Sequence, residues 1–326
     1  MFNLSLGSEG QVDAQQLFDV VIVGAGAAGF TAGIYTARDG WKTLILEKEA
    51  SGGLAASTHK IENYPGFPQG IDGSELMERF QQQAERFGAQ LAEFDAVTRI
   101  EKNAAGLFEI HTESGKMYRG RAVLLATGSQ PKKLGIPGEA ELYPRGVSYC
   151  ATCDGPLYAD QEVAVVGCGN SGLQEAEILL QYARKVTFVE YLDHSIAEKV
   201  LQERVQSNPK AVCKLSHQVV EIKGEQSVSA LVIKDRQSGQ VEEIPVAAVF
   251  IYVGYQPDTD FVRGLVDLDE HGYILTDEHM RTSVEGIFAA GDVRANNLAQ
   301  VAVAVGDGAK AAVAMREYLQ RRAPQG

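Results

Sequence analysis

The sequence predicts an α/β protein made of two similar domains, with the second domain inserted into the first. A pattern of apolar strand, glycine-rich loop, helix and second strand occurs twice, beginning near residues 18 and 162, and such alternation is typical of α/β folds. The C-terminal part then returns to the strand and helix plan of the first domain. We expect residues 18–131 and 255–326 to form the first domain and 132–254 the second, with 1–17 as an N-terminal extension.

The first copy of the pattern opens with the apolar run from Phe18 to Val23, which is suited to a buried parallel strand. A glycine-rich loop, 24–29, leads into a small-residue helix to about Arg38, and a second strand ends in Glu47, 23 residues after the first glycine. Glycines let the backbone approach a pyrophosphate, the helix N-terminus donates N–H groups to it, and the acid accepts hydrogen bonds from a ribose. The sequence therefore predicts a dinucleotide site with contacts from Gly24, Gly26, Gly29 and Glu47.

The second copy has the same order and spacing. An apolar strand, 162–166, is followed by a glycine loop, 167–172, a helix from Leu173 to about Tyr182, and a strand that ends in Glu190, again 23 residues after the first glycine. This repetition indicates an internal duplication, so we expect both domains to be Rossmann-like dinucleotide-binding units. The contacts predicted for the second site are Gly167, Gly169, Gly172 and Glu190.

Further strands are expected before and after the second copy. Phe108–Thr112 is strand-like, and an apolar strand over 122–125 runs into the turn Thr127-Gly128. Near the C-terminus, another apolar segment ends in Asp292, and a helix is expected from about Gln300 to Leu319. These segments complete the first domain around the inserted one.

Composition and charge exclude several classes of protein. Of 326 residues, 45% are hydrophobic and 22% charged, and 43 acidic against 30 basic residues give a net charge of −13. With no basic run, we expect no nucleic-acid binding, and with no apolar stretch of about 20 residues we expect no membrane span. Residues 1–17 lack the basic and apolar regions of a signal peptide. Together with two unpaired cysteines, this predicts a reducing, cytoplasmic location.

The motif Cys150-Ala151-Thr152-Cys153-Asp154 lies between the two glycine loops. A four-thiolate zinc site needs a second such pair, but Cys168 and Cys213 stand alone and the histidines have no metal-like spacing. We therefore predict no metal, and we interpret Cys150 and Cys153 as a disulfide that takes electrons from a bound cofactor. Cys168 and Cys213 are expected to be small packing residues.

Several motifs in order along the chain, from Phe18 to Leu319, resemble those of the low-molecular-weight thioredoxin reductases. Besides the first glycine loop with Glu47 and the cysteine motif, they are Glu62-Asn63-Tyr64-Pro65-Gly66-Phe67, Ala126-Thr127-Gly128, Val253-Gly254-Tyr255-Gln256-Pro257 and Ala289-Ala290-Gly291-Asp292-Val293. These enzymes are flavoprotein disulfide reductases with two dinucleotide domains. The resemblance implies an FAD enzyme, a homodimer and a thioredoxin-like disulfide protein as partner.

The resemblance also implies which residues contact FAD. Gly24, Gly26 and Gly29 hold the pyrophosphate and Glu47 the adenosine ribose, while further residues line the flavin or its ribityl chain. These further residues are Gly53, Leu54, Asn63, Thr127, Gly128, Asp292, Gln300 and Val301. The chain departs from the family at one flavin contact, reading Gly52-Gly53-Leu54 where the family usually has Gly-Gly-Gln-Leu.

In the family, Cys153 is the sulfur near the flavin and Cys150 attacks the substrate disulfide, because a thiolate is needed both to receive electrons and to attack. Asp154 is the acid/base that handles the thiol proton. Taken alone, Asp154 is also suited to a turn or helix cap before Gly155-Pro156.

The second unit departs from members of the family that use NADPH. Those proteins follow the second strand with His-Arg-Arg and a later Arg, where this chain has Glu190, Tyr191, Leu192 and Ile196. Losing those cations and placing a carboxylate near the 2′-phosphate costs on the order of several kcal/mol, about a thousandfold in affinity. We therefore predict that NADPH is not the donor.

Three occupants of the second site remain open. Glu190 suits the unphosphorylated ribose of NAD(H), and its likeness to Glu47 equally suits a second FAD, as in diflavin-linked relatives. Alternatively the site is empty and ferredoxin reduces the flavin. Tyr191 either stacks on an adenine or covers the domain surface.

The leading hypothesis is a disulfide reductase with a donor other than NADPH. A dithiol oxidase that passes electrons to oxygen is the alternative, and a non-catalytic redox sensor is a minor one.

Overall fold

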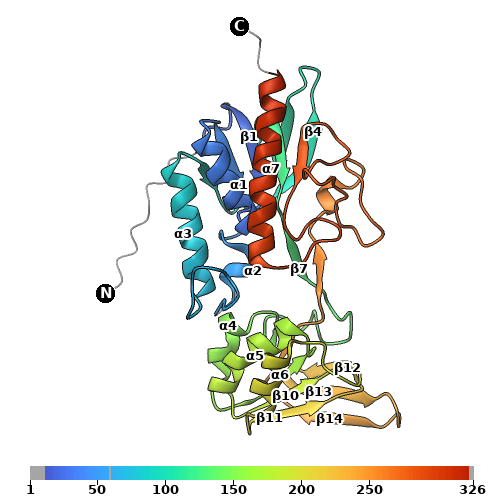
Figure 1. The fold of residues 1–326 in the computed structure, drawn as a ribbon. Coiled ribbons are helices and arrows are strands. Elements are labelled where there is room, and N and C mark those ends of the chain that lie inside the picture. The colour runs from blue at the N-terminus through green and yellow to red at the C-terminus, as the bar shows by residue number, and fades with distance from the viewer. Residues whose placement is uncertain (1–11, 59, 323–326) are drawn as a thin grey trace. The chain divides into compact units, whose positions relative to one another are not determined.

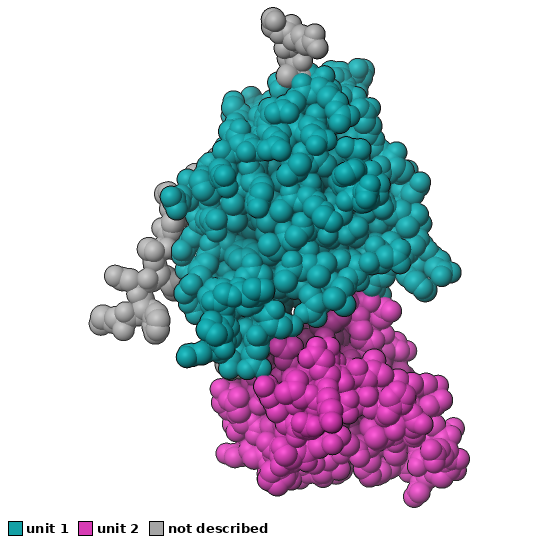
Figure 2. All heavy atoms as spheres, in the orientation of Figure 1, with its two compact units in different colours: residues 1–56, 60–129, 256–326 teal, residues 57–59, 130–255 magenta. Residues whose placement is uncertain are grey.

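The computed structural model describes residues 12–58 and 60–322. The chain forms two compact units, one within 1–56, 60–129 and 256–326 and the other comprising 57–59 and 130–255 (Figure 2). Apart from the short segment 57–59, the chain crosses between the two units at 129/130 and 255/256, beside the predicted boundaries at 131/132 and 254/255. At the crossings, the short strands β7 (Ser129–Pro131) and β16 (Tyr255–Pro257) pair with each other. Most of the predicted extension 1–17 lies outside the described residues, and the first strand begins at Leu17.

The first unit is built on a seven-stranded sheet with the order β3-β2-β1-β6-β5-β4, in which β17 also pairs with β6. Strands β3, β2, β1, β6 and β17 pair in parallel, whereas β4, β5 and β6 are antiparallel. The bounds are β1 Leu17–Val23, β2 Thr43–Leu46, β3 Gln90–Ala92, β4 Val97–Lys102, β5 Phe108–Thr112, β6 Met117–Leu125 and β17 Ile287–Ala289. The predicted strands are all present, and β6 is longer than the apolar run alone indicated.

Helix α7 runs alongside α1 in the first unit (Figure 1). Small residues make this close packing feasible, because a Cβ added to Gly308 would meet the Ala28 carbonyl oxygen at 2.3 Å. The apolar faces of both helices enclose one core with Ile22, Phe30 and Met315. The helices of this unit are α1 Ala27–Arg38, α2 Gly53–Ala56, α3 Gly73–Arg86, α7 Val301–Arg322 and the 3₁₀ helix η2 Asp260–Val262.

The second unit contains a five-stranded parallel sheet with the order β11-β10-β9-β15-β8. A three-stranded antiparallel sheet, β12-β13-β14, packs against one of its faces, and α5 and α6 cover the other. The strands are β8 Val147–Ser148, β9 Glu162–Val166, β10 Lys185–Val189, β11 Ala211–Lys214, β12 His217–Gly224, β13 Val228–Asp235, β14 Val241–Pro245 and β15 Ala248–Ile251. The helices are α4 Ala151–Asp154, η1 Gly155–Tyr158, α5 Asn170–Tyr182 and α6 Lys199–Gln206.

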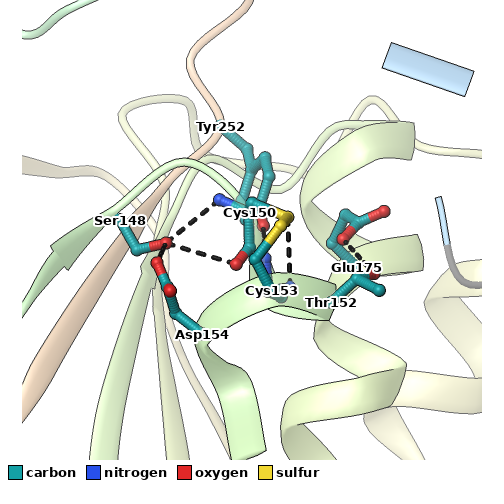
Figure 3. The surroundings of a disulfide bond; sticks show 8 residues. Ser148, Cys150, Thr152, Cys153, Asp154, Glu175 and Tyr252 are labelled. Atoms are coloured by element: carbon teal, nitrogen blue, oxygen red, sulfur yellow. Dashed lines mark hydrogen bonds between the residues drawn. A yellow bond between two sulfur atoms is a disulfide. The ribbon is translucent and has the colours of Figure 1, made fainter. Parts of the chain in front are cut away.

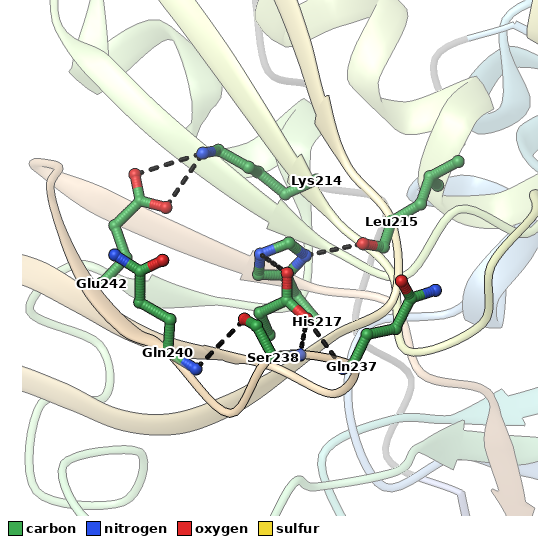
Figure 4. A network of polar contacts seen from close by, with 8 residues as sticks. Lys214, Leu215, His217, Gln237, Ser238, Gln240 and Glu242 are labelled. Carbon is green, nitrogen blue, oxygen red and sulfur yellow. Dashed lines mark hydrogen bonds and ion pairs between the residues drawn. The ribbon is translucent and has the colours of Figure 1, made fainter.

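Side chains fix the turn that joins β13 to β14. The Asp235 carboxylate accepts hydrogen bonds from the backbone N–H groups of Gln237 and Ser238 at 2.7 and 3.0 Å. Figure 4 shows this turn beside the ion pair of Lys214 with Glu242, whose atoms lie 2.9 Å apart. The turn therefore holds the intervening residue, Arg236, in a defined position.

Two expectations from the sequence need correction. Cys213, expected to be a packing residue, is exposed, whereas Cys168 is buried as predicted. Helix α5 begins at Asn170 rather than Leu173, because Gly169 already ends the extended backbone of the loop. None of the helices in the described part of the chain is long and apolar enough to cross a membrane.

Candidate active site and dinucleotide sites

Cys150 and Cys153 form a disulfide at the short helix α4, with their Cα atoms 5.4 Å apart. Cys150 is the N-cap of this helix, and its sulfur accepts a hydrogen bond from the Cys153 backbone N–H at 3.1 Å. Cys153 is exposed and Cys150 is half-buried. An N–H donor aimed at the Cys150 sulfur favours the thiolate form after reduction, which is the form that attacks a disulfide.

Ser148 connects Asp154 to the disulfide, a role that the sequence analysis did not assign. Its hydroxyl donates to the Asp154 carboxylate at 2.6 Å and accepts from the Cys150 backbone N–H at 3.1 Å (Figure 3). The carboxylate is therefore held at a fixed place beside the cysteine pair. The one available sequence signal was a hydroxyl residue two positions before the first cysteine, which is weak evidence.

Tyr252 is a second residue that the sequence analysis missed. It follows β15, and its phenol oxygen accepts a hydrogen bond from the Ala151 backbone N–H at 2.8 Å. Burial raises the pKa of Tyr252 well above its ordinary value, so the phenol keeps its proton. Tyr252 thus anchors the segment between the two cysteines to the parallel sheet.

The first glycine loop has the shape that a pyrophosphate requires. A Cβ added to Gly24 would meet the Ala126 carbonyl oxygen at 2.2 Å, and one added to Gly29 would meet the Gly24 oxygen at 1.9 Å. At Gly26, by contrast, an added Cβ would have nothing within 4 Å, and no side chain caps helix α1. The uncapped helix N-terminus therefore faces open space that suits an anion.

Glu47 is oriented for a ribose by the loop itself. One carboxylate oxygen accepts from the Ala25 N–H at 2.8 Å, and the other accepts from the Lys48 N–H at 2.8 Å. Gly53, at the start of α2 with Leu54, lies beside the loop, because its added Cβ would be 3.6 Å from the Gly26 Cα.

The residues expected near the flavin come together from distant parts of the first unit. The Asn63 amide donates to the Gln300 side-chain oxygen at 2.8 Å, and Val301 begins α7 next to it. The Thr127 hydroxyl, however, donates to the Asp258 carbonyl oxygen at 2.8 Å, so in this arrangement it does not donate a hydrogen bond to a flavin. Gly128 has a φ of +66° and open space around it.

Asp292 lies three residues after the end of β17, in a turn organised by an ion pair that the sequence analysis missed. Arg294 and Asp307 are 2.6 Å apart, with side-chain exposures of 14% and 9%, and Asp307 also accepts from the Gly291 N–H. Burial and the Asp307 charge raise the pKa of Asp292 to about 6. A half-buried carboxyl of this kind is suited to a hydroxyl-rich ligand such as a ribityl chain. The open loop, Glu47 and Asp292 together fit FAD.

The second glycine loop reproduces the first. Added Cβ atoms at Gly167 and Gly172 would meet backbone oxygens at 2.1 Å, whereas at Gly169 only the Ile196 side chain lies within 4 Å. Glu190 is 8% exposed, and its carboxylate accepts from the N–H groups of Cys168 and Leu192 at 2.7 and 2.9 Å. This carboxylate therefore has the same relation to its loop as Glu47 has to the first.

Folding brings one cation to the second site from outside the aligned segment. The Arg236 guanidinium lies 3.7 Å from the centre of the Tyr191 ring and donates to the Tyr191 carbonyl oxygen at 2.8 Å. Tyr191 itself is 53% exposed. The positions after β10 carry no positive charge, as the sequence indicated, but Arg236 lies beside them because the β13–β14 turn packs there.

No cluster of three His, Cys, Asp or Glu residues suited to a metal occurs among residues 12–58 and 60–322.

Comparison with known proteins gives a consistent assignment. A family model for pyridine nucleotide-disulphide oxidoreductases matches residues 18–308. The thioredoxin reductase of Treponema pallidum is 43% identical over 302 residues, which cover 93% of this chain and 97% of that protein. The structure of Lactococcus lactis thioredoxin reductase has 40% identity and a TM-score of 0.89, covering 93% of this chain and 99% of that one. For T. acidophilum thioredoxin reductase the values are 42%, 0.88, 94% and 99%.

Proposed function

The chain belongs to the low-molecular-weight thioredoxin reductases, FAD enzymes among the pyridine nucleotide-disulphide oxidoreductases, and we propose that it reduces a thioredoxin-like protein with electrons from a donor other than NADPH. The observation that carries the donor part is the position of Glu190. By family resemblance, Glu190 stands at a position where NADPH-using members carry a residue that binds the 2′-phosphate, and its carboxylate is hydrogen-bonded to the loop as that of Glu47 is in the first unit.

FAD, when bound in the first unit, would supply two electrons to the disulfide. The residues that fit it are the first glycine loop, Glu47 and Asp292, with Asn63 and Gln300 at the start of α7. The first glycine loop has room for the pyrophosphate because no side chain fills it. The uncapped N–H groups at the start of α1 stabilise the negative charge of the pyrophosphate.

The cysteine pair then performs thiol–disulfide exchange on the partner. The Cys150 thiolate attacks the partner disulfide and forms a mixed disulfide, which Cys153 resolves to restore the intramolecular bond. Asp154, held by Ser148, delivers a proton to the departing thiolate. Each cycle thus returns the protein to the oxidised form seen in the structure.

The second site suits a dinucleotide whose adenosine ribose has a free 2′-hydroxyl. NADH and FAD share that chemistry, and a carboxylate accepts hydrogen bonds from such hydroxyls but repels a phosphate. Arg236 offsets the repulsion only partly, because it already stacks on Tyr191 and lies near the Asp193 carboxylate. The intact loop favours an occupied site over direct reduction of the flavin by ferredoxin. A homodimer is part of this proposal by family resemblance.

Thiol production tests the disulfide part of the proposal. Oxygen-free protein, reduced with dithionite and freed of excess reductant, is mixed with oxidised thioredoxin, and new thioredoxin thiols are counted by alkylation and mass. We expect up to four thiols per chain, two from the Cys150–Cys153 dithiol and two from the reduced flavin that reduces this pair again, and none with Cys150→Ser. An absence of thiol gain with the wild type would reject the function.

A further inference from the structure

A second carboxyl lies beside the disulfide and has no part in the exchange described above. Glu175, in the first half of α5, accepts a hydrogen bond from the Thr152 hydroxyl at 3.3 Å and another from the Thr152 backbone N–H. Thr152 stands between the two cysteines. Figure 3 shows Glu175 and Thr152 on one side of the disulfide, with Ser148 and Asp154 on the other. Two carboxyls therefore flank the cysteine pair.

The chemistry of Glu175 is that of a group that exchanges a proton. Burial raises its pKa to about 7, because a carboxylate is poorly solvated there. A purely structural acceptor for the Thr152 hydroxyl needs no charge, since a glutamine would serve without the cost of burying one. A carboxyl that is partly protonated at neutral pH can both give and take a proton.

The neighbouring groups leave this role to Glu175 on its side of the disulfide. Tyr252 interacts electrostatically with both Glu175 and Asp154, but its raised pKa keeps it neutral. Tyr158 on η1, which interacts with Asp154, also has a raised pKa. On α5 itself, Glu177 is turned to Arg204 of α6, 3.5 Å away.

We propose that Glu175 is a positioning residue that exchanges a proton with the Cys150–Cys153 pair through the Thr152 hydroxyl. The inference deepens the proposed function, because it concerns the same disulfide. Reduction breaks the sulfur–sulfur bond and takes up two electrons and two protons, giving two thiols. The electrons come from the reduced flavin or, in the experiment below, from an added dithiol.

Asp154 and Glu175 each account for one of the two protons. When Glu175 is protonated, its O–H donates to the Thr152 oxygen, and the Thr152 hydroxyl is released to donate to a sulfur. When Glu175 loses that proton, the hydroxyl turns back to the carboxylate, which is the arrangement seen beside the disulfide. The hydroxyl thus passes a proton without itself changing charge.

The experiment follows the rate at which dithiothreitol reduces the disulfide of the intact flavoprotein across neutral pH. Samples are quenched by alkylation, the peptide carrying both cysteines is weighed by mass spectrometry, and rates are corrected for the thiolate fraction of the reductant. For the wild type we expect an inflection near pH 7, at the pKa of Glu175. Glu175→Gln removes it and slows reduction below that pH on the order of tenfold, less than a directly placed acid contributes.

Matched variants separate proton exchange from a structural effect. Thr152→Val keeps the carboxyl but cuts the path, so it also abolishes the inflection, and it carries the test if Glu175→Gln fails to fold. Glu175→Asp restores an inflection at a shifted pH, and Glu177→Gln on the same helix leaves the profile unchanged. Profiles of Glu175→Gln and Thr152→Val that superimpose on the wild type overturn the proposal. Failure of the wild type to reduce thioredoxin rejects the proposed function instead.

Discussion

Glu190 accepts a hydrogen bond from the backbone N–H of Cys168 at 2.7 Å, which joins the end of β10 to the glycine loop after β9. Glu47 and Ala25 make the same bond at 2.8 Å in the first unit. The two loops are therefore duplicates in hydrogen bonding as well as in sequence spacing. A site that repeats an FAD loop at this level is suited to an adenosine ribose that carries no phosphate.

Introducing cations after β10 should enable the second site to bind NADPH. The variant Glu190→His, Tyr191→Arg and Leu192→Arg replaces a repelling carboxylate with two guanidinium groups, which bind phosphate through paired hydrogen bonds. We expect NADPH affinity to rise by about a hundredfold, with a much smaller change for NADH. Equilibrium titration with each nucleotide measures this. Equal changes for both nucleotides would show that position 190 does not select against the phosphate.

Ser148→Ala should slow disulfide exchange while leaving the flavin in place. The substitution removes the 2.6 Å hydrogen bond that orients Asp154, so the carboxylate loses its fixed position. A fall in turnover of about tenfold is expected, since an acid/base contributes through its placement. Thioredoxin reduction and flavin content are measured together, with Ser207→Ala, an exposed serine of the same unit, as control. Turnover equal to the wild type contradicts the role of Ser148.

Breaking the ion pair of Arg294 and Asp307 should destabilise the first unit. Arg294→Ala leaves a carboxylate buried without its cation, which costs about 3 kcal/mol of unfolding free energy. The turn around Asp292 should loosen as well, so FAD should be lost more readily on dilution. In the double variant with Asp307→Asn, part of the stability should return, because the unpaired charge is gone. Denaturant unfolding and released flavin fluorescence are the two readouts.

The cysteines should differ sharply in labelling. Burial, with the Glu190 carboxylate nearby, raises the pKa of Cys168 to about 12, so at neutral pH it is a buried thiol rather than a thiolate. Cys213 is exposed. In the native oxidised protein we expect one alkylated cysteine, which Cys213→Ser abolishes, two after unfolding and four after unfolding with reduction. Rapid labelling of native Cys168 would contradict this description of the second loop.

The charge of Glu175 should make the stability of the protein depend on pH. Its folded pKa of about 7 lies above the ordinary 4.5, so the folded state holds a proton that the unfolded state loses. The unfolding free energy therefore falls as pH rises between these two values and levels off above the higher one. Glu175→Gln should remove that fall, adding on the order of 2 kcal/mol at pH 8 and little at pH 4. A pH-independent difference between the two proteins would contradict the raised pKa.

The sequence predicted the elements that follow from local pattern. Each apolar run became a strand, and both glycine loops were located because the turn leaves no room for a Cβ, as at Gly24 and Gly167. The disulfide was predicted because Cys150 and Cys153 form a C-x-x-C motif between the two glycine loops, with no second pair to complete a zinc site. Residues whose role depends on long-range packing were missed. Ser148, Tyr252 and Arg236 reach their partners only through the order of the strands, which no local pattern reveals.

The exposure of Cys213 was predicted wrongly for a related reason. The residue belongs to β11, which is the edge strand of the second parallel sheet. Free cysteines are in general among the most buried residues, but at an edge strand one neighbouring strand is missing. Arg236 was missed because the sequence analysis compared only the positions that directly follow β10. The Arg236 cation reaches this site from the β13–β14 turn, which is distant in sequence.

Anaerobic titration of the purified protein with NADPH decides whether the second site excludes this nucleotide while the disulfide and the flavin site are intact. The visible absorbance of the bound flavin is followed as nucleotide is added. We predict that equimolar NADPH leaves the oxidised flavin spectrum unchanged, although dithionite reduces the same sample fully. Complete bleaching by one equivalent of NADPH would contradict it.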